Sequence, residues 1–236
     1  GFLTESLVQK FIFVLFQKSH LENLYPFTTN TLSITKGLIA DLKVSRFQLN
    51  DISGAIEKGS HHRQINHSYQ PIGVLTLWFE SLNKVDLKKL ISNLQKAFDD
   101  VWYFEVDEKV VLNNLPIDGE NSFTQYAFIS KHSNMSKTAF FDHWQDVHTE
   151  IAINTQSTFS YIQNTITQDF SQNHAPFLAI VEESFPIAAL EDPAIFYNAD
   201  SKEVLEKNIA RMMESCQKFL NFEEIIVFPT KQLNSM

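Results

Sequence analysis

Residues 11–16 read FIFVLF and residues 74–79 read VLTLWF. Both segments have the length and the aromatic and β-branched content of strands, but neither alternates between apolar and polar side chains. An antiparallel sheet with helices on one face and water on the other should show that alternation. We therefore expect both faces of these strands to be covered, most economically by helices on one face and by a second sheet on the other.

The same order of elements is predicted on both sides of residues 113–122, a linker that contains Pro116 and Gly119. Before the linker, strands are expected at 10–16, 46–52, 72–80 and 109–112, with helices at 32–42 and from Asp86 to Phe98. After the linker, strands are expected at 123–130, 159–166, 177–183 and 223–228, with helices from Ser136 to about Ile153 and from Asp200 onward. Asp86 and Ser136 are the expected N-caps, and Asp200 with Glu203 is the expected capping pair of the last helix.

The order β-α-β-β-α-β, present twice, is that of ferredoxin-like units. The sequence thus predicts an α+β fold of two such units, residues 5–115 and 120–232, whose antiparallel sheets pair into a barrel with the helices outside. A linker of about ten residues spans roughly 30 Å. This reach favours a barrel closed within one chain over a barrel formed between two chains, although a homodimer stays open.

Composition excludes several classes of protein. The 236 residues carry a formal charge of −9, which disfavours a nucleic-acid partner. The six glycines are too scattered for a dinucleotide-binding or phosphate-binding loop. The longest apolar run has six residues, far short of the roughly 20 of a membrane span, so no membrane partner is expected. Cys216 stands alone on an apolar helix stripe with Leu205, Ile209, Met212 and Leu220, which predicts an inert core thiol, no disulfide and a cytoplasmic location.

The stretch FFDHWQDVH at 140–148, followed by YIQN at 161–164, resembles the EthD family of the dimeric α+β barrel superfamily. The strand segments 73–81, 107–112 and 223–228 resemble the same family, and the resemblance is stronger over 120–230 than over 8–115. It implies a ferredoxin-like unit whose sheet pairs face to face with another to enclose a cavity. Members are linked to the catabolism of small ethers or to the tailoring of aromatic polyketides. The superfamily also holds haem-binding branches and cofactor-free monooxygenases, cyclases and decarboxylases, so the fold leaves the chemistry open.

Aligning YIQN with FQLN at 47–50 sets Phe47 opposite Tyr161, Asn30 opposite Trp144 and Ile34 opposite His148. An isoleucine can neither transfer a proton nor donate a hydrogen bond. The N-terminal half is therefore expected to be degenerate, and one ligand site per chain is expected, within residues 123–230.

His148 is the first candidate for chemistry. At 100° per residue it falls about 40° from Trp144 on an apolar helix face, where burial keeps an imidazole neutral. A neutral imidazole beside a cavity can act as general base, hydrogen-bond donor or metal ligand. The alternative is a core histidine bonded to a backbone carbonyl. His143 lies at the edge of the same face, where it either assists His148 or caps the helix.

Five further residues are expected to bind substrate. Trp144 would shape the pocket, and the polar tips of strand residues would line it, with ordinary packing as the alternative for each: Tyr126, Tyr161, Gln163 and Glu183. No metal set is expected, because the adjacent His61 and His62 have no Cys, Asp or Glu nearby.

The resulting hypothesis is a protein that binds a small hydrophobic compound, aromatic or a keto acid. Whether it is an enzyme stays open; if it is, the reaction is expected to need no cofactor, with His148 as acid and base. One alternative is a non-catalytic binding or scaffold protein. Another is a haem- or metal-binding member of the superfamily that uses His148 as ligand.

Overall fold

The computed structural model describes residues 8–17, 33, 35–52, 70–171 and 176–235. Asn30, Ile34, His61 and His62 lie outside the described residues, so the structure does not test the expectations that rest on them.

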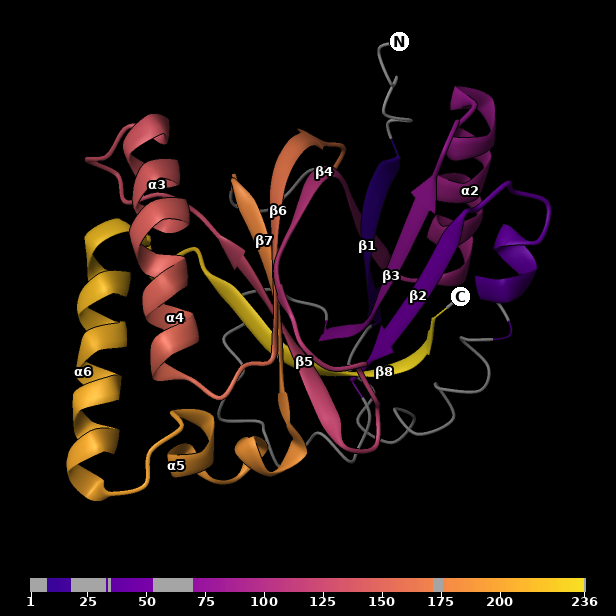
Figure 1. Cartoon of the computed structure of the whole chain (residues 1–236). Helices are drawn as coiled ribbons and strands as arrows, with labels where there is room; N and C mark the ends of the chain where they lie inside the picture. Colours follow the sequence, from indigo (N-terminus) through magenta and orange to yellow (C-terminus); the bar gives the residue numbers. More distant parts are fainter. Residues whose placement is uncertain (1–7, 18–32, 34, 53–69, 172–175, 236) are drawn as a thin grey trace, which may run out of the picture.

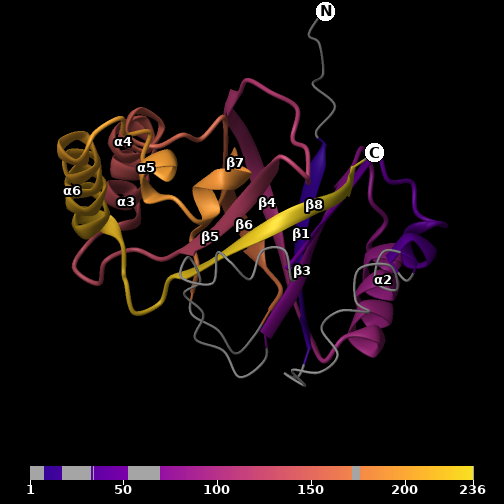
Figure 2. The same cartoon turned by 90° about the horizontal axis from the view of Figure 1, so that it is seen from below.

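Eight antiparallel strands form one closed barrel (Figures 1 and 2). The first four are β1 (Gln9–Gln17), β2 (Arg46–Asp51), β3 (Gln70–Phe79) and β4 (Asp100–Asn113), paired in the order β4-β1-β3-β2. The second four are β5 (Ser122–Ile129), β6 (Ser160–Asp169), β7 (Ala179–Pro186) and β8 (Ile226–Ser235), paired in the order β8-β5-β7-β6. Contacts of β4 with β6 and of β2 with β8 join the two sets. The predicted barrel within one chain is thereby confirmed.

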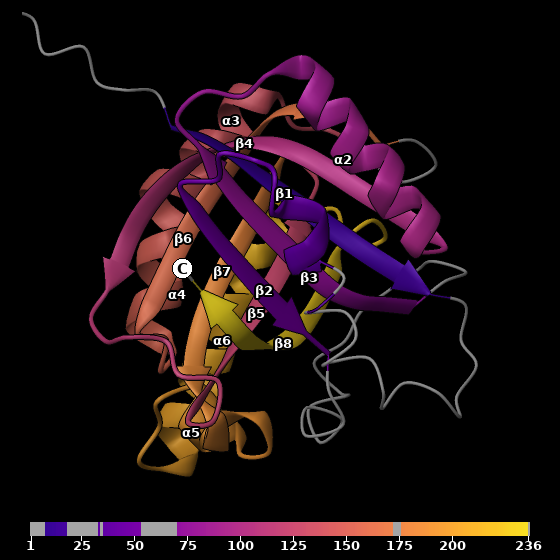
Figure 3. The ribbon, with the colours of Figure 1, turned by 90° about the vertical axis from the view of Figure 1, so that its right-hand side faces the viewer.

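The helices lie outside the barrel. Helix α2 (Lys84–Ala97) lies across the outer face of the β1–β4 set, next to a short helical stretch at 35–39 (Figure 3). Outside the β5–β8 set, α3 (Lys137–His143), the π-helix η2 (Trp144–His148) and α4 (Thr149–Thr155) form one continuous rod beside α6 (Lys202–Phe219) (Figure 1). The 3-10 helix η3 (Ile187–Leu190) and α5 (Pro193–Phe196) close one end of this layer.

Three apolar layers explain why residues 11–16 do not alternate. Phe11, Phe13 and Leu15 pack under α2, while Ile12 and Val14 point into the barrel. Each of these side chains is at most 1% exposed. The third layer lies between the β5–β8 set and its helices. The expectation that both faces of these strands are covered is confirmed.

A charged cluster lies inside the barrel and connects the two strand sets. The Lys10 ammonium on β1 donates to Glu182 Oε2 on β7 at 2.7 Å, to Asn164 Oδ1 on β6 at 2.8 Å, and to Glu108 on β4. Tyr126 donates its hydroxyl to the other oxygen of Glu182 at 3.1 Å. Burial raises the pKa of Glu182, but the attraction of Lys10 and these hydrogen bonds outweigh it and hold that pKa below its ordinary value.

Two local expectations are wrong. Strand β4 begins at Asp100 rather than at Lys109, so Glu108 lies within a barrel strand, where it is paired with Lys10. Asn83, not Asp86, caps α2 by accepting a hydrogen bond from the Val85 amide.

Two other caps can be judged as well. Ser136 caps α3 as expected, accepting from the Ala139 amide at 3.1 Å. Helix α6 is capped by Ser201 through the Val204 amide, one residue after the expected Asp200.

We predict that Lys10→Met lowers the free energy of unfolding by about 3–5 kcal/mol, because it leaves the buried Glu182 carboxylate without its cation. Urea denaturation of the variant and of Lys109→Met measures the effect. Lys109 is exposed on the same strand as Glu108, so its replacement should change stability by no more than about 0.5 kcal/mol. Equal losses in the two variants would contradict a role for the buried ion pair.

A second prediction concerns the linker. A Cβ atom added to Gly119 would lie 2.2 Å from the Gln232 carbonyl oxygen on β8, whereas one added to Gly37 meets nothing within 4 Å. Gly119→Ala should therefore destabilise the protein by about 1–3 kcal/mol. Gly37→Ala, in the helical stretch, should stabilise it by about 0.4–1 kcal/mol. Thermal unfolding of the two variants compares them directly, and a neutral Gly119→Ala would contradict this packing of the linker.

Candidate functional site

A cavity of about 440 Å³ lies between the outer face of the β5–β8 set and the helices that cover it. Its wall includes Trp144 and His148 from the rod, Tyr161 and Glu183 from the strands, and Phe219 from α6. The volume is in the range of about 300–1,000 Å³ typical of small-molecule sites. The cavity therefore lies outside the barrel, under the helices, and not between two paired sheets as the family resemblance implies.

The π-helix shapes the helical wall of this cavity. Within η2, the Thr149 amide bonds to the Trp144 carbonyl five residues earlier, and the Thr149 hydroxyl donates to the same carbonyl at 2.7 Å. A regular α-helix brings residues three or four apart onto one face, but a π-turn aligns residues five apart. His143 and His148 are thus brought to the same side of the rod, with their ring centroids 6.4 Å apart.

His148 is buried at 7% exposure and forms part of the cavity wall. Its Nδ1 lies 2.8 Å from the Ser215 hydroxyl oxygen, and its ring centroid is 4.7 Å from that of Phe219. Burial, with a smaller contribution from the nearby His143, lowers the pKa of His148 to about 4. The imidazole is therefore neutral at neutral pH.

His143 is half-buried and is not part of the cavity wall. Its Nε2 lies 3.0 Å from the same Ser215 hydroxyl oxygen. Burial lowers the pKa of His143, the Ser215 backbone opposes this shift, and Lys218 adds to it. The Ser215 hydroxyl therefore bridges His143 and His148.

Glu183 is the acidic group of the cavity. It is 8% exposed, and its Oε2 has no hydrogen-bond partner among the described residues. Burial raises the pKa of Glu183 to about 8, so the carboxyl is mostly protonated at neutral pH. In the part of the chain that the structure describes, no Lys or Arg contributes to the wall.

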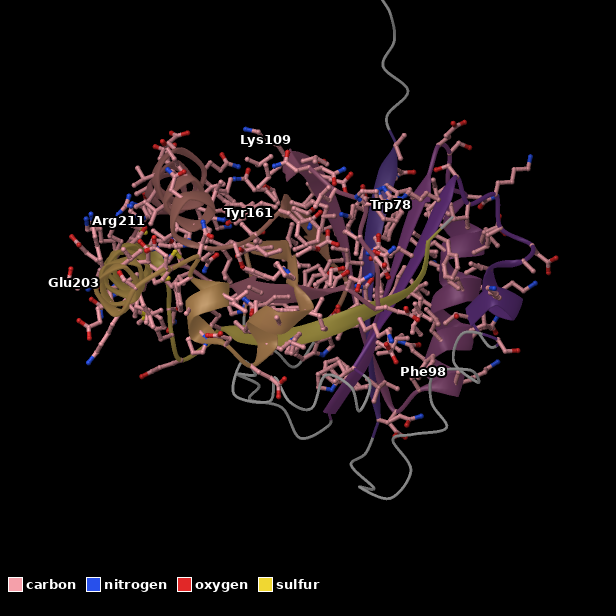
Figure 4. All side chains as sticks on the ribbon, turned by 60° about the horizontal axis from the view of Figure 1, so that its bottom comes forward. Trp78, Phe98, Lys109, Tyr161, Glu203 and Arg211 are labelled. Atoms are coloured by element: carbon pink, nitrogen blue, oxygen red, sulfur yellow. The ribbon has the colours of Figure 1, made fainter. Side chains whose placement is uncertain are left out.

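Tyr161 stands opposite Glu183 in the pairing of β6 with β7. Its side chain is 1% exposed, and Figure 4 shows it on the side of the sheet that faces the helices. Burial, followed by the neighbouring Glu183, raises the pKa of Tyr161 above its ordinary value. The phenol therefore stays protonated and acts only as a neutral hydrogen-bonding group.

Two predicted substrate-binding residues lie elsewhere. Tyr126 points to the other face of the sheet, into the barrel, where it bonds to Glu182. Gln163 is on the expected face but buried away from the wall, and it donates to the Thr149 hydroxyl at 2.8 Å. Strand alternation does not specify these two positions. Tyr126 depends on which side of β5 faces the barrel, and Gln163 depends on the Thr149 hydroxyl that bonds to it.

Ser215 and Gln156 were not predicted as site residues from the sequence. The expected buried stripe of α6 contained Met212 and Cys216, but the residues buried on this helix are Asn208, Met212, Ser215 and Phe219. Because Asn208 and Ser215 are polar, the apolar pattern of the sequence does not indicate that they lie on the buried face of α6. Cys216 is half-buried in the cavity wall, where burial raises its pKa to about 12, so its thiol stays protonated at neutral pH.

Two searches of the described residues concern metals and membranes. Among them, no three His, Cys, Asp or Glu side chains are close enough together to hold a metal ion. None of the described helices is both long and apolar enough to span a membrane.

Comparison with known families finds a match to the EthD domain over residues 132–221. This segment of the chain is EthD-like. The matched residues of this EthD-like segment contain the rod, β6, β7 and α6, and therefore most of the cavity wall. A comparison with curated proteins finds no match.

Solved structures show the same fold at low sequence identity. An anthrone oxidase-like protein is 6% identical, with a TM-score of 0.59, and the match covers 97% of this chain and 92% of that one. A candidate monooxygenase from Fusobacterium nucleatum subsp. nucleatum is 11% identical, with a TM-score of 0.50, over 97% of this chain and 93% of that one. At such identities these similarities establish the fold alone.

We predict that the contribution of Glu183 to the free energy of unfolding falls as the pH rises from about 4.5 to about 8, whereas that of His148, whose pKa is lowered, rises up to about pH 6.5. In this range the unfolded chain ionises Glu183 while the folded chain keeps it protonated, so ionisation favours unfolding. A tenfold difference in proton affinity corresponds to about 1.4 kcal/mol, so the total loss should be a few kcal/mol. Glu183→Gln should remove this part of the pH dependence, as measured by urea denaturation across the range.

The control is Glu203→Gln, which changes an exposed carboxylate on the solvent side of α6 (Figure 4). Its pH profile should follow that of the wild type. A Glu183→Gln profile parallel to the wild type would show that Glu183 ionises normally in the folded protein.

Proposed function

We propose that the cavity binds a small, uncharged, mainly apolar molecule that carries an oxygen group, such as a hydroxylated or keto-substituted aromatic compound. The observation that carries the proposal is Glu183, a carboxyl group in the cavity wall for which the described residues of that wall provide no cation. Burying such a group costs stability, and perturbed carboxyls in clefts cluster at functional sites. A ligand oxygen can accept the hydrogen bond of its protonated form.

The charge of the cavity supports an uncharged ligand. Glu183 and His148 are both neutral at neutral pH, and no Lys or Arg is among the described wall residues. A buried carboxylate on the ligand would therefore lose its hydration without gaining a cation. These facts favour the aromatic alternative of the sequence hypothesis over the keto acid.

The proposed chemistry, where the protein acts as an enzyme, is acid–base catalysis without a cofactor. His148 is a neutral base, and Glu183 is a protonated acid in the same wall. Pairs of titratable groups whose environments push their pKa values apart are typical of acid–base sites. His148 would accept a proton from the bound molecule while Glu183 donates a hydrogen bond to its oxygen.

We also propose that the chain contains two ferredoxin-like units, residues 5–115 and 120–232, of which only the second holds a ligand site. The repeated strand order supports this proposal. The pairing registers support it further, because Phe47 pairs with Leu77 on β3 as Tyr161 pairs with Glu183 on β7.

Side-chain size supports a single site. The same registers match Phe13 on β1 to Ala127 on β5. Phe13 pairs with Leu75 on β3, and Ala127 pairs with Val181 on β7. Phe13 and Leu75 fill the layer under α2, whereas Ala127 and Val181 line the cavity. The large side chains of the first set occupy the volume that is open in the second.

Ligand binding can be tested by tryptophan quenching with 4-nitrobenzyl alcohol and 4-nitrobenzoate, two nitroaromatic probes of similar size that differ in charge. Of the three tryptophans, only Trp144 contributes to the cavity wall. We expect saturable quenching by the alcohol, loss of that quenching in Trp144→Phe, and its retention in Trp78→Phe and Trp102→Phe. The anionic probe should bind at least about tenfold more weakly, a difference of about 1.4 kcal/mol.

Four outcomes would contradict the proposal or part of it. Unchanged quenching in Trp144→Phe would place the probe elsewhere, and equal binding of both probes would overturn the preference for an uncharged ligand. A haem absorption band in the purified protein would favour the haem-binding alternative. His148→Gln that binds the alcohol like the wild type would assign His148 to packing.

A further inference from the structure

The Ser215 side chain contacts both His143 and His148. Its hydroxyl oxygen lies 2.8 Å from His148 Nδ1 and 3.0 Å from His143 Nε2, both within hydrogen-bond distance. Ser215 is 2% exposed, and Phe219, one turn later on α6, packs against both imidazole rings at 5.0 and 4.7 Å between centroids. The three side chains are therefore fixed in one geometry by α6 and by the π-turn.

The available protons restrict how these groups can bond. A serine hydroxyl has one proton and two lone pairs. If Ser215 accepted from both rings, its own proton would have no acceptor among the described residues, so it donates to one ring and accepts from the other. A neutral imidazole also has one N–H. Two arrangements satisfy both contacts: Ser215 donates to His143 while His148 donates from Nδ1, or Ser215 donates to His148 while His143 donates from Nε2.

The two arrangements differ in whether His148 Nε2, the ring nitrogen that does not bond to Ser215, carries a proton. His148 Nε2 has no hydrogen-bond partner among the described residues, and His148 forms part of the cavity wall. In the first arrangement the proton of His148 is on Nδ1, so Nε2 is an acceptor. In the second arrangement the proton is on Nε2, which then is a donor.

We propose that Ser215 couples the two histidines, so that the protonation state of the half-exposed His143 decides whether the cavity-facing nitrogen of His148 donates or accepts. A doubly protonated His143 must donate from Nε2 to Ser215. The Ser215 proton then has only His148 Nδ1 to bond to, which places the single proton of His148 on Nε2. Ser215 and His143 are thus positioning residues for His148.

The same three groups can move a proton out of the cavity. If His148 Nε2 takes a proton from the bound molecule, its Nδ1 proton passes to the Ser215 oxygen, and the Ser215 proton passes to His143 Nε2. His143 then releases its Nδ1 proton to water. One proton leaves the ligand, one reaches the solvent, and all three side chains end uncharged.

Other ionisable groups around the rings do not change charge in the range where a histidine titrates. Glu183 on β7, Tyr161 on β6 and Cys216 on α6 contribute to the same wall as His148, and burial keeps all three protonated below about pH 7. The positive charge of Lys218 on α6 lowers the pKa of His143. A change at His148 in this range therefore reports on His143.

The experiment is NMR of protein labelled with 15N-histidine, titrated from about pH 7 to pH 5 without ligand, because 15N chemical shifts distinguish the two imidazole tautomers. We expect the signal of the Nδ1-protonated form of His148 to be lost as His143 takes up its proton. In Ser215→Ala the tautomer ratio of His148 should no longer follow His143, and Ser215→Thr, which keeps a hydroxyl, should restore the coupling.

His143→Phe offers a test that leaves Ser215 in place, and it should make the His148 tautomer ratio independent of pH. The proposal is overturned if the wild-type ratio stays constant through the His143 titration, or if it changes equally in Ser215→Ala or His143→Phe. The role of this coupling in moving a proton from a bound molecule rests on the proposed function of the cavity. Because the titration needs no ligand, its failure is distinguishable from a failure of the protein to bind the nitroaromatic probes.

Discussion

The buried ammonium of Lys10 constrains the whole barrel. It is bound by acceptors from both strand sets, so neither set can slide along its neighbour without separating a buried cation from a buried anion. A slip of one residue would also turn every side chain of a strand to its opposite face. The cluster thereby fixes which residues point into the barrel and which point toward the helices.

With the interior occupied by this cluster and by an aromatic core, space for a ligand depends on the outer faces. In the first set that face carries Phe11 and Phe13 and is filled by α2. In the second set it carries Ala127 and Val181, and the rod and α6 stand over a cavity instead. The two sets share a strand order but differ in side-chain volume, and this difference accounts for the asymmetry of the molecule.

The sequence predicted most of the architecture because its signals were local. The apolar runs at 11–16 and 74–79 required two covered faces, and FFDHWQDVH identified the EthD-like segment. It could not predict the π-turn, in which the amide and the hydroxyl of Thr149 both bond to the Trp144 carbonyl. Without that turn, the helical periodicity separates His143 from His148 and gives no reason to select Ser215.

The side of the sheet that each strand residue faces was a second limit. Alternation correctly grouped Tyr161 with Gln163, but the position of Tyr126 depended on which face of β5 turned inward. Similarly, the acidic residues before Lys109 gave no sign that Glu108 would meet a lysine almost a hundred positions earlier. Contacts between distant segments decide both cases, and a single sequence does not contain them.

Glu182 and Glu183 are neighbours on β7, yet burial affects them in opposite ways. Glu182 points into the barrel, where Lys10 and Tyr126 bond to it, and its pKa is lowered despite burial. Glu183 points to the cavity, where its Oε2 has no hydrogen-bond partner among the described residues and burial raises its pKa to about 8. The first carboxylate stabilises the fold, whereas the second destabilises it at neutral and higher pH. Among the described residues, one face of β7 thus provides partners for the Glu182 carboxylate, whereas the cavity face provides none for Oε2 of Glu183.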